Sequence, residues 1–172
     1  MRSKYDIFVS YYREHSKLVR ALVLMLRIGK RYIFLDEDEL TPGQKWEENL
    51  IAGLKNAKWV VVIWCVHAKE SKWVNREIKI AIDQNKSVIP VLIDNAPLPK
   101  VLSQFQWIDL RGLVRHDLID NRDQRTLNMP DDEDPSISRF VLINKYSSLI
   151  DNQGIIIARA VQDFLMSHDV VE

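Results

Sequence analysis

Short, almost continuous hydrophobic runs alternate with stretches of helical periodicity along most of this chain. The runs WVVVIWC at 59–65 and SVIPVLID at 87–94 carry apolar residues at nearly every position. A strand covered by helices on both faces has this composition, whereas a strand with one face in water alternates apolar and polar residues. The pattern therefore predicts a parallel sheet between two layers of helices.

The same pattern places five strands and the helices between them. We expect strands at 5–11, 31–36, 58–65, 87–94 and 107–110, and helices at about 14–27, 45–56, across the WVNRE segment at 73–77, and at 155–165. The predicted fold class is α/β, a flavodoxin-like three-layer fold with a central parallel five-stranded sheet flanked by helices. We expect residues 1–110 to form the core, 111–135 to be a charged surface insertion with the acidic tract DDED, and 136–172 to form C-terminal helices that complete the same domain.

Charge and cysteine content exclude several classes of partner. The 172 residues include 24 Lys and Arg against 24 Asp and Glu, so no overall positive field favours nucleic acid or an anionic membrane. The single cysteine excludes an internal disulfide and fits a reducing cytoplasm. The N-terminal residues do not resemble a signal peptide, and no apolar run approaches the roughly 20 residues that span a bilayer. We expect a cytoplasmic protein.

Two common nucleotide-binding signatures are absent from the sequence. With glycines only at 29, 43, 53, 112 and 154, neither GxGxxG nor GxxxxGK[ST] can be written. This disfavours a Rossmann dehydrogenase and a P-loop nucleotidase. A phosphate-accepting receiver domain needs an Asp at the end of its third strand, where this chain has IWC.

Trp73 and Glu77 form the most informative pair in the sequence. They are four residues apart at the start of a helical pattern, so they share one helix face. That helix follows directly on the buried run at 59–65, and open α/β sheets bind their ligands outside the carboxyl ends of their strands. The pair is therefore a candidate for site residues.

The second predicted strand runs into an acidic loop, DEDE at 36–39, closed by a Pro-Gly turn. A charge run of this kind usually keeps a connection solvated. Four carboxylates at one strand end also suit a divalent ion, but the spacing places no partner ligand beside them. We expect no metal site.

Three blocks of this sequence resemble the signature blocks of a TIR (Toll/interleukin receptor) domain, in the same order. They are YDIFVSY at 5–11, FLDEDELTPGQKW at 34–46 and WVNREI at 73–78. The resemblance covers about Lys4 to Leu110 and includes WIDL at 107–110; the segment 111–136 departs from the usual short connection. It implies the TIR fold and makes Asp38–Lys45 the BB loop, which commonly mediates contact between TIR domains.

The resemblance also implies an activity. Many TIR domains, particularly bacterial and plant ones, are NAD⁺ glycohydrolases or cyclases whose catalytic residue is the Glu of the third helix, here Glu77. NAD⁺ is then the substrate, and no separate cofactor is expected. One carboxylate suffices because nicotinamide leaves as a neutral molecule without a general acid, unlike the leaving groups of ordinary glycosidases. The products are nicotinamide and ADP-ribose or a cyclic ADP-ribose signal.

Further residues near the ends of the predicted strands are candidates for substrate binding. They are Ser10, Tyr11, Arg13, Phe34, Asp36, Asp38, Trp46, Cys65 and Trp73. Simpler roles are open for several of them. Trp73 suits core packing, Arg13 a plain surface position and Trp46 an anchor for the loop. Ser10 and Tyr11 suit a helix-entry turn, and Cys65 suits a small core position.

Two functions of different classes follow. The first is a cytoplasmic NAD⁺-cleaving enzyme, similar to the stand-alone prokaryotic TIR proteins that make nucleotide signals for a downstream effector in antiphage defence. The second is a non-catalytic adaptor that works by self-association through the Asp38–Lys45 loop. A pure adaptor need not keep Glu77, so its presence beside Trp73 favours the enzyme.

Overall fold

The computed structural model describes residues 4–34, 45–113 and 152–169, and its centre is a five-stranded, all-parallel sheet. The strands are β1 (Tyr5–Ser10), β2 (Ile33–Phe34), β3 (Ala57–Trp64), β4 (Ser87–Leu92) and β5 (Ile108–Asp109). Their order in the sheet is β2-β1-β3-β4-β5. This order confirms the predicted flavodoxin-like α/β fold, and its switch point lies between β1 and β3.

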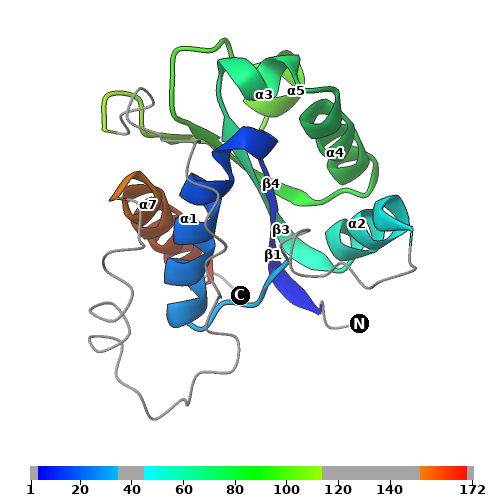
Figure 1. Cartoon of the computed structure of the whole chain (residues 1–172), viewed down its shortest axis with the longest axis horizontal. Coiled ribbons are helices and arrows are strands. Elements are labelled where there is room, and N and C mark those ends of the chain that lie inside the picture. The colour runs from blue at the N-terminus through cyan, green and yellow to red at the C-terminus, as the bar shows by residue number, and fades with distance from the viewer. Residues whose placement is uncertain (1–3, 35–44, 114–151, 170–172) are drawn as a thin grey trace.

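Helices cover both faces of the sheet (Figure 1). They are α1 (Ser16–Ile28), α2 (Trp46–Lys55), α3 (Val66–Glu70), α4 (Lys72–Asp83), α5 (Lys100–Ser103) and α7 (Asn152–Asp169), with a 3₁₀ turn η1 (Arg13–His15) before α1. Helices α1 and α7 pack together on one face, and α2 and α4 pack together on the other. The short helices α3 and α5 lie at the end of the sheet where the strands terminate (Figure 1).

The apolar runs identified in the sequence form the middle of the domain. In β3, the side chains from Val60 to Trp64 are each at most 1% exposed, and so is that of Cys65, the residue after the strand. Residues Tyr5 to Ser10 of β1 pair in register with Ala57 to Val62 of β3, and β3 pairs along its length with β4. Because β3 pairs with β1 on one side and with β4 on the other, the carboxyl ends of these three strands hold fixed positions next to one another.

Several predicted segments lie outside the described residues. They are the acidic loop at 36–39, the insertion from residue 114 to 135, and the segment from 136 to 151. The predicted terminal helix at 155–165 is confirmed as α7, which extends beyond it at both ends. Within the described residues, no helix has the length and apolar character needed to cross a membrane.

Gly154 provides a test of the contact between α1 and α7. A Cβ atom at this position would lie 2.7 Å from the Cβ of Ala21 and 2.7 Å from the carbonyl oxygen of Leu18. We expect Gly154→Ala to destabilise the domain by about 1–3 kcal/mol, because overpacking outweighs the better helix propensity of alanine. Urea denaturation measures the change, with Arg159→Ala on the exposed side of α7 as the control. Equal stability of the two variants would contradict this packing.

Candidate functional site

Glu77 is buried within the apolar face of α4. The helix begins at Lys72, and the side chain of Ser71 caps it by accepting a hydrogen bond from the Val74 N–H at 3.2 Å. Helical spacing directs four residues inward, and they are Val74, Glu77, Ile78 and Ala81. Glu77 is only 4% exposed. This burial excludes the simpler alternative of a surface glutamate that pairs with a nearby lysine. A carboxylate buried in this way needs hydrogen-bond donors around it.

Ser10 supplies such a donor from another element. It is the last residue of β1, it is 0% exposed, and its Oγ–H donates a hydrogen bond to Oε2 of Glu77, 67 residues away in sequence. Alternation along β1 puts Ser10 on the same face as Phe8, the face that α2 and α4 cover. The carboxylate therefore lies at the carboxyl end of β1, beside the switch point where doubly wound sheets bind ligands.

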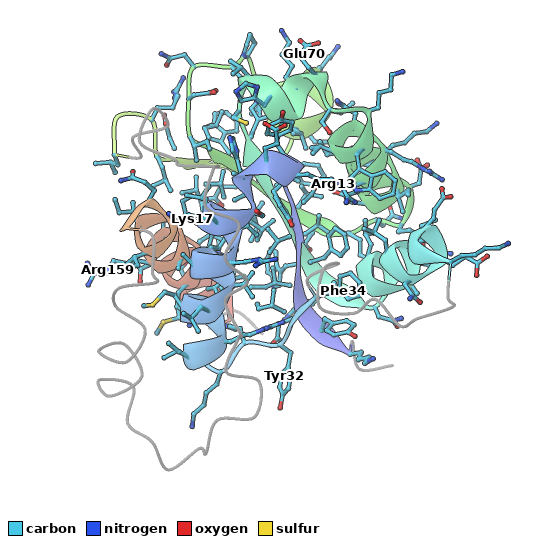
Figure 2. The ribbon with its side chains drawn as sticks, in the orientation of Figure 1. Arg13, Lys17, Tyr32, Phe34, Glu70 and Arg159 are labelled. Atoms are coloured by element: carbon cyan, nitrogen blue, oxygen red, sulfur yellow. The ribbon has the colours of Figure 1, made fainter. Side chains whose placement is uncertain are left out.

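Trp73 lies one helical turn before Glu77, partly buried against the core. The guanidinium of Arg13 lies over its ring at 5.4 Å from the centroid, and that of Arg76 lies at 5.8 Å. Figure 2 shows Arg13 on the turn before α1, on the side of α4. The structure thus brings together two of the predicted residues, Arg13 and Trp73, from either side of the switch point.

Arg76 also connects α4 to the start of α2. Its guanidinium forms an ion pair with Glu47, a residue of the first turn of α2. Trp46 is the first residue of that helix, and the structure describes its backbone but not its side chain. Its role in binding therefore stays a prediction. Asp36 and Asp38 lie outside the described residues, and their binding roles stay predictions.

Phe34 and Tyr11 are core residues. Phe34 is 4% exposed, stacks on Phe8 with ring centroids 5.4 Å apart, and meets the edge of Tyr5 at 5.2 Å. A Cβ atom at Gly53 of α2 would lie 2.4 Å from this ring, so the helix approaches Phe34 as closely as a glycine allows. Tyr11 is 5% exposed. The structure therefore gives both residues a packing role, and contact with substrate stays a prediction.

Cys65 follows β3 and caps α3. Its side chain is 0% exposed, and its Sγ accepts a hydrogen bond from the Ala68 N–H at 3.3 Å. Burial raises the pKa of the Cys65 thiol above 9.0, although the backbone hydrogen bonds from Ala68 and His67 oppose this shift. At neutral pH the residue is an uncharged thiol with a structural role as a helix cap.

Sequence reasoning did not identify a cluster of three rings at the same end of the sheet. Tyr12 stacks on His67 with centroids 4.9 Å apart, and His15 meets the edges of Tyr12 and His67 at 5.2 Å and 5.8 Å. Partial burial raises the pKa of Tyr12 above 10.0, and a hydrogen bond to Glu14 adds to the shift. The only sequence signal was the position of these residues just after β1 and β3. In the described part of the chain, no three His, Cys, Asp or Glu side chains group in a way that could hold a metal ion.

The architecture defines a class of protein: a doubly wound parallel α/β domain with a buried helical carboxylate at the end of its first strand. Comparison with protein families then identifies the family. The family model described as "TIR domain" matches residues 7–125, which is more than half of the chain. The chain belongs to the TIR domain family.

Two curated relatives and one solved structure are informative. The chain is 30% identical over 110 residues to the NAD(+) hydrolase sarm1 of Drosophila melanogaster, a match that covers 59% of this chain and 8% of that protein. It is 25% identical over 104 residues to the probable 2' cyclic ADP-D-ribose synthase BdTIR of Brachypodium distachyon, covering 59% of this chain and 46% of that protein. The chain thus spans less than half the length of either relative.

The structural comparison supports the same fold. The crystal structure of the TIR domain of the Toll-related receptor TRR-2 from Hydra magnipapillata superposes with a TM-score of 0.55 at 20% sequence identity. The match covers 62% of this chain and 84% of that one. At this level of identity the likeness concerns the fold alone.

The placement of Cys65 predicts a thiol that reacts slowly. In the native protein at pH 8, we expect iodoacetamide to alkylate it at least about 100-fold more slowly than in the urea-unfolded chain, because the thiol is buried and uncharged. Cys65 is the only cysteine, so intact mass spectrometry reports on this one site. Similar rates in the two states would contradict the burial of the thiol.

Proposed function

We propose that this TIR domain cleaves NAD⁺ at the bond between nicotinamide and ribose, releasing nicotinamide and ADP-ribose or a cyclic form of it. The observation that carries the proposal is the buried Glu77 carboxylate, which accepts a hydrogen bond from Ser10 at the carboxyl end of β1. The names of two distant relatives, an NAD(+) hydrolase and a probable 2' cyclic ADP-D-ribose synthase, support the same substrate.

The chemistry of the substrate suits a single buried carboxylate. The nicotinamide ring of NAD⁺ is cationic, so when its bond to ribose breaks it takes the bonding electrons and leaves as a neutral molecule. Positive charge then develops on the anomeric carbon and the ring oxygen of the ribose. An ionised Glu77 opposes this charge, and it does so more strongly in a water-poor site than in bulk water. Its oxygens can also accept hydrogen bonds from ribose hydroxyls.

The neighbouring residues suit the remaining parts of a dinucleotide. Trp73 lies one turn from Glu77 and offers an aromatic surface for the nicotinamide or the ribose. Arg13 and Arg76 lie over the same ring, and their guanidinium groups can donate hydrogen bonds to the pyrophosphate. We assign these roles as part of the proposal, together with contacts from Asp36, Asp38 and Trp46, whereas Tyr11, Phe34 and Cys65 would support the site through the core.

Hydrolysis and cyclisation share the step that Glu77 supports. After nicotinamide leaves, water attack on the anomeric carbon gives ADP-ribose, whereas attack from within the same nucleotide gives a cyclic product. The outcome depends on which nucleophile reaches the cation first. Chromatography of the products against the linear and cyclic standards distinguishes the two.

We further propose that the nucleotide product is a signal read by a downstream effector in prokaryotic antiphage defence. This part of the proposal is an analogy with prokaryotic TIR proteins that make nucleotide signals, because the three sequence blocks resemble TIR signature blocks. Plating of phage on bacteria that express the wild type or Glu77→Gln tests it. Protection that requires Glu77 supports the signalling role, and equal plaque counts on both strains contradict it.

Replacing Glu77 by glutamine tests the cleavage itself. Glu77→Gln keeps the shape of the side chain but removes the charge that opposes the oxocarbenium-like transition state. We expect nicotinamide release to fall at least about 100-fold, the loss typical when a key electrostatic group is removed. Nicotinamide is measured by liquid chromatography at several protein concentrations.

The matched control is Glu70→Gln, the same change on α3 at an exposed position that points away from the domain (Figure 2). Circular dichroism confirms that both variants fold. If Glu77→Gln releases nicotinamide as fast as the wild type and Glu70→Gln do, the catalytic assignment of Glu77 is wrong.

Self-association through the Asp38–Lys45 loop is a second part of the proposal, supported by the family resemblance of this segment. If a neighbouring copy completes the site, turnover per molecule rises with protein concentration because more sites are complete. Nicotinamide release across a dilution series measures this, and reconcentrating the most dilute sample controls for inactivation. Constant turnover per molecule across the series would count against a shared site.

A further inference from the structure

The hydrogen bond between Ser10 and Glu77 gives the serine a role that its position in the sequence does not reveal. We propose that Ser10 is a positioning residue for Glu77, whose hydroxyl fixes the orientation of the carboxylate and favours its ionised form. The inference rests on the proposed function and deepens it. Ser10 then acts through Glu77, rather than by contacting the phosphate or ribose of the substrate.

The two residues differ in how firmly the fold holds them. Ser10 is the last residue of β1 and pairs in register with Val62 of the central strand β3, so the sheet fixes its backbone on that side. Its side chain has a single carbon, and its hydroxyl position follows closely from the backbone. Glu77 lies on a helix and has three side-chain torsions before its carboxylate. A donor fixed by the sheet therefore adds a restraint on the orientation of the carboxylate.

Burial makes this hydrogen bond chemically important. Glu77 is 4% exposed and Ser10 is 0% exposed, so water has little access to either group. Burial disfavours the ionised form of a carboxylic acid, whereas a hydrogen bond donated to the carboxylate favours it. A serine hydroxyl does not titrate in the working pH range, so it can act as a donor throughout. The bond offsets part of the burial cost where the proposed reaction needs a negative charge.

The competing role for Ser10 is direct contact with substrate, and the two roles predict different kinetics. Loss of a substrate contact made equally in the ground and transition states raises KM and leaves kcat unchanged. Loss of a positioning residue lowers kcat, because the carboxylate is less ordered and less often ionised. It also moves the acid limb of the pH profile of kcat to higher pH, because a higher pH is then needed to ionise Glu77.

Three substitutions separate the hydrogen bond from packing. Ser10→Ala removes the donor, Ser10→Cys keeps a similar size but offers only a weak S–H donor, and Ser10→Thr keeps the hydroxyl. Ile7→Val is the matched control, because it removes one buried methylene from the same strand on the opposite face and leaves the hydroxyl in place. Thermal unfolding confirms that each variant is folded at the assay temperature.

The first measurement needs no turnover. Carbon-13 NMR of glutamate-labelled protein follows the Glu77 carboxyl signal with pH, and the spectrum of Glu77→Gln assigns it. We expect the titration midpoint to rise by about one pH unit in Ser10→Ala and Ser10→Cys, the size that loss of a hydrogen bond to a charged group implies. It should stay close to the wild-type value in Ser10→Thr and Ile7→Val.

The second measurement is the pH profile of nicotinamide release at saturating NAD⁺. We expect kcat at neutral pH to fall about 10- to 100-fold in Ser10→Ala and Ser10→Cys, with the acid limb moved upward. Ser10→Thr should restore most of the rate.

Three results would overturn the inference, and a fourth would separate it from the proposed reaction. An unchanged Glu77 midpoint in both Ser10→Ala and Ser10→Cys would overturn it, and so would a rise in KM with kcat and the pH profile unchanged. Equal effects of Ile7→Val and Ser10→Ala would also overturn it, because they would assign the effect to packing. A wild type that releases no nicotinamide, combined with a raised midpoint in Ser10→Ala, would refute the proposed reaction but support the control of Glu77 by Ser10.

Discussion

The burial of one carboxylate governs the arrangement at the end of this sheet. Removing an ionisable group from water costs several kcal/mol unless donors replace the lost hydration. Glu77 meets this requirement through Ser10, which belongs to a different element and lies 67 residues earlier in the chain. The bond forms only if α4 packs against the end of β1, so the fold has to be complete before the carboxylate is satisfied. The sheet order and the apolar face of α4 both serve this placement.

The surroundings of Trp73 connect the carboxylate to two other parts of the domain. Arg13 reaches the ring from the turn after β1, and Arg76 lies over it while forming an ion pair with Glu47 in the first turn of α2. That turn directly follows the Asp38–Lys45 segment, which the family resemblance marks as the loop for contact between TIR domains. Both partners of the ion pair are about half exposed, so the link contributes little stability. It can therefore rearrange easily if a partner or a substrate competes for Arg76.

The comparisons and the structure contribute different kinds of support. The family match and the superposition on a Toll-related receptor domain concern the fold, and TIR folds serve in receptors as well as in proteins named as NAD(+) hydrolases. Fold alone therefore does not decide between an enzyme and a binding module. The buried, hydrogen-bonded Glu77 supports the enzyme, because an adaptor has no evident need to maintain an acidic group in its interior.

The sequence alone determined the fold class and the placement of most elements, because burial on both faces of a strand and the helical period leave direct traces in the order of residues. Glu77 became the leading catalytic candidate through the resemblance of three sequence blocks to TIR domains. The sequence predicted strand β3 and helices α1, α2 and α7, and it placed Trp73 and Glu77 on one helix face just past a buried strand. It did not determine which side chain meets the carboxylate, that Phe34 packs against Phe8 and Gly53, or that Tyr12, His15 and His67 gather in one cluster. Only the tertiary structure decided these contacts. Periodicity specifies the face of a helix or strand on which a residue lies, but the partner of that residue depends on which elements the sheet brings side by side.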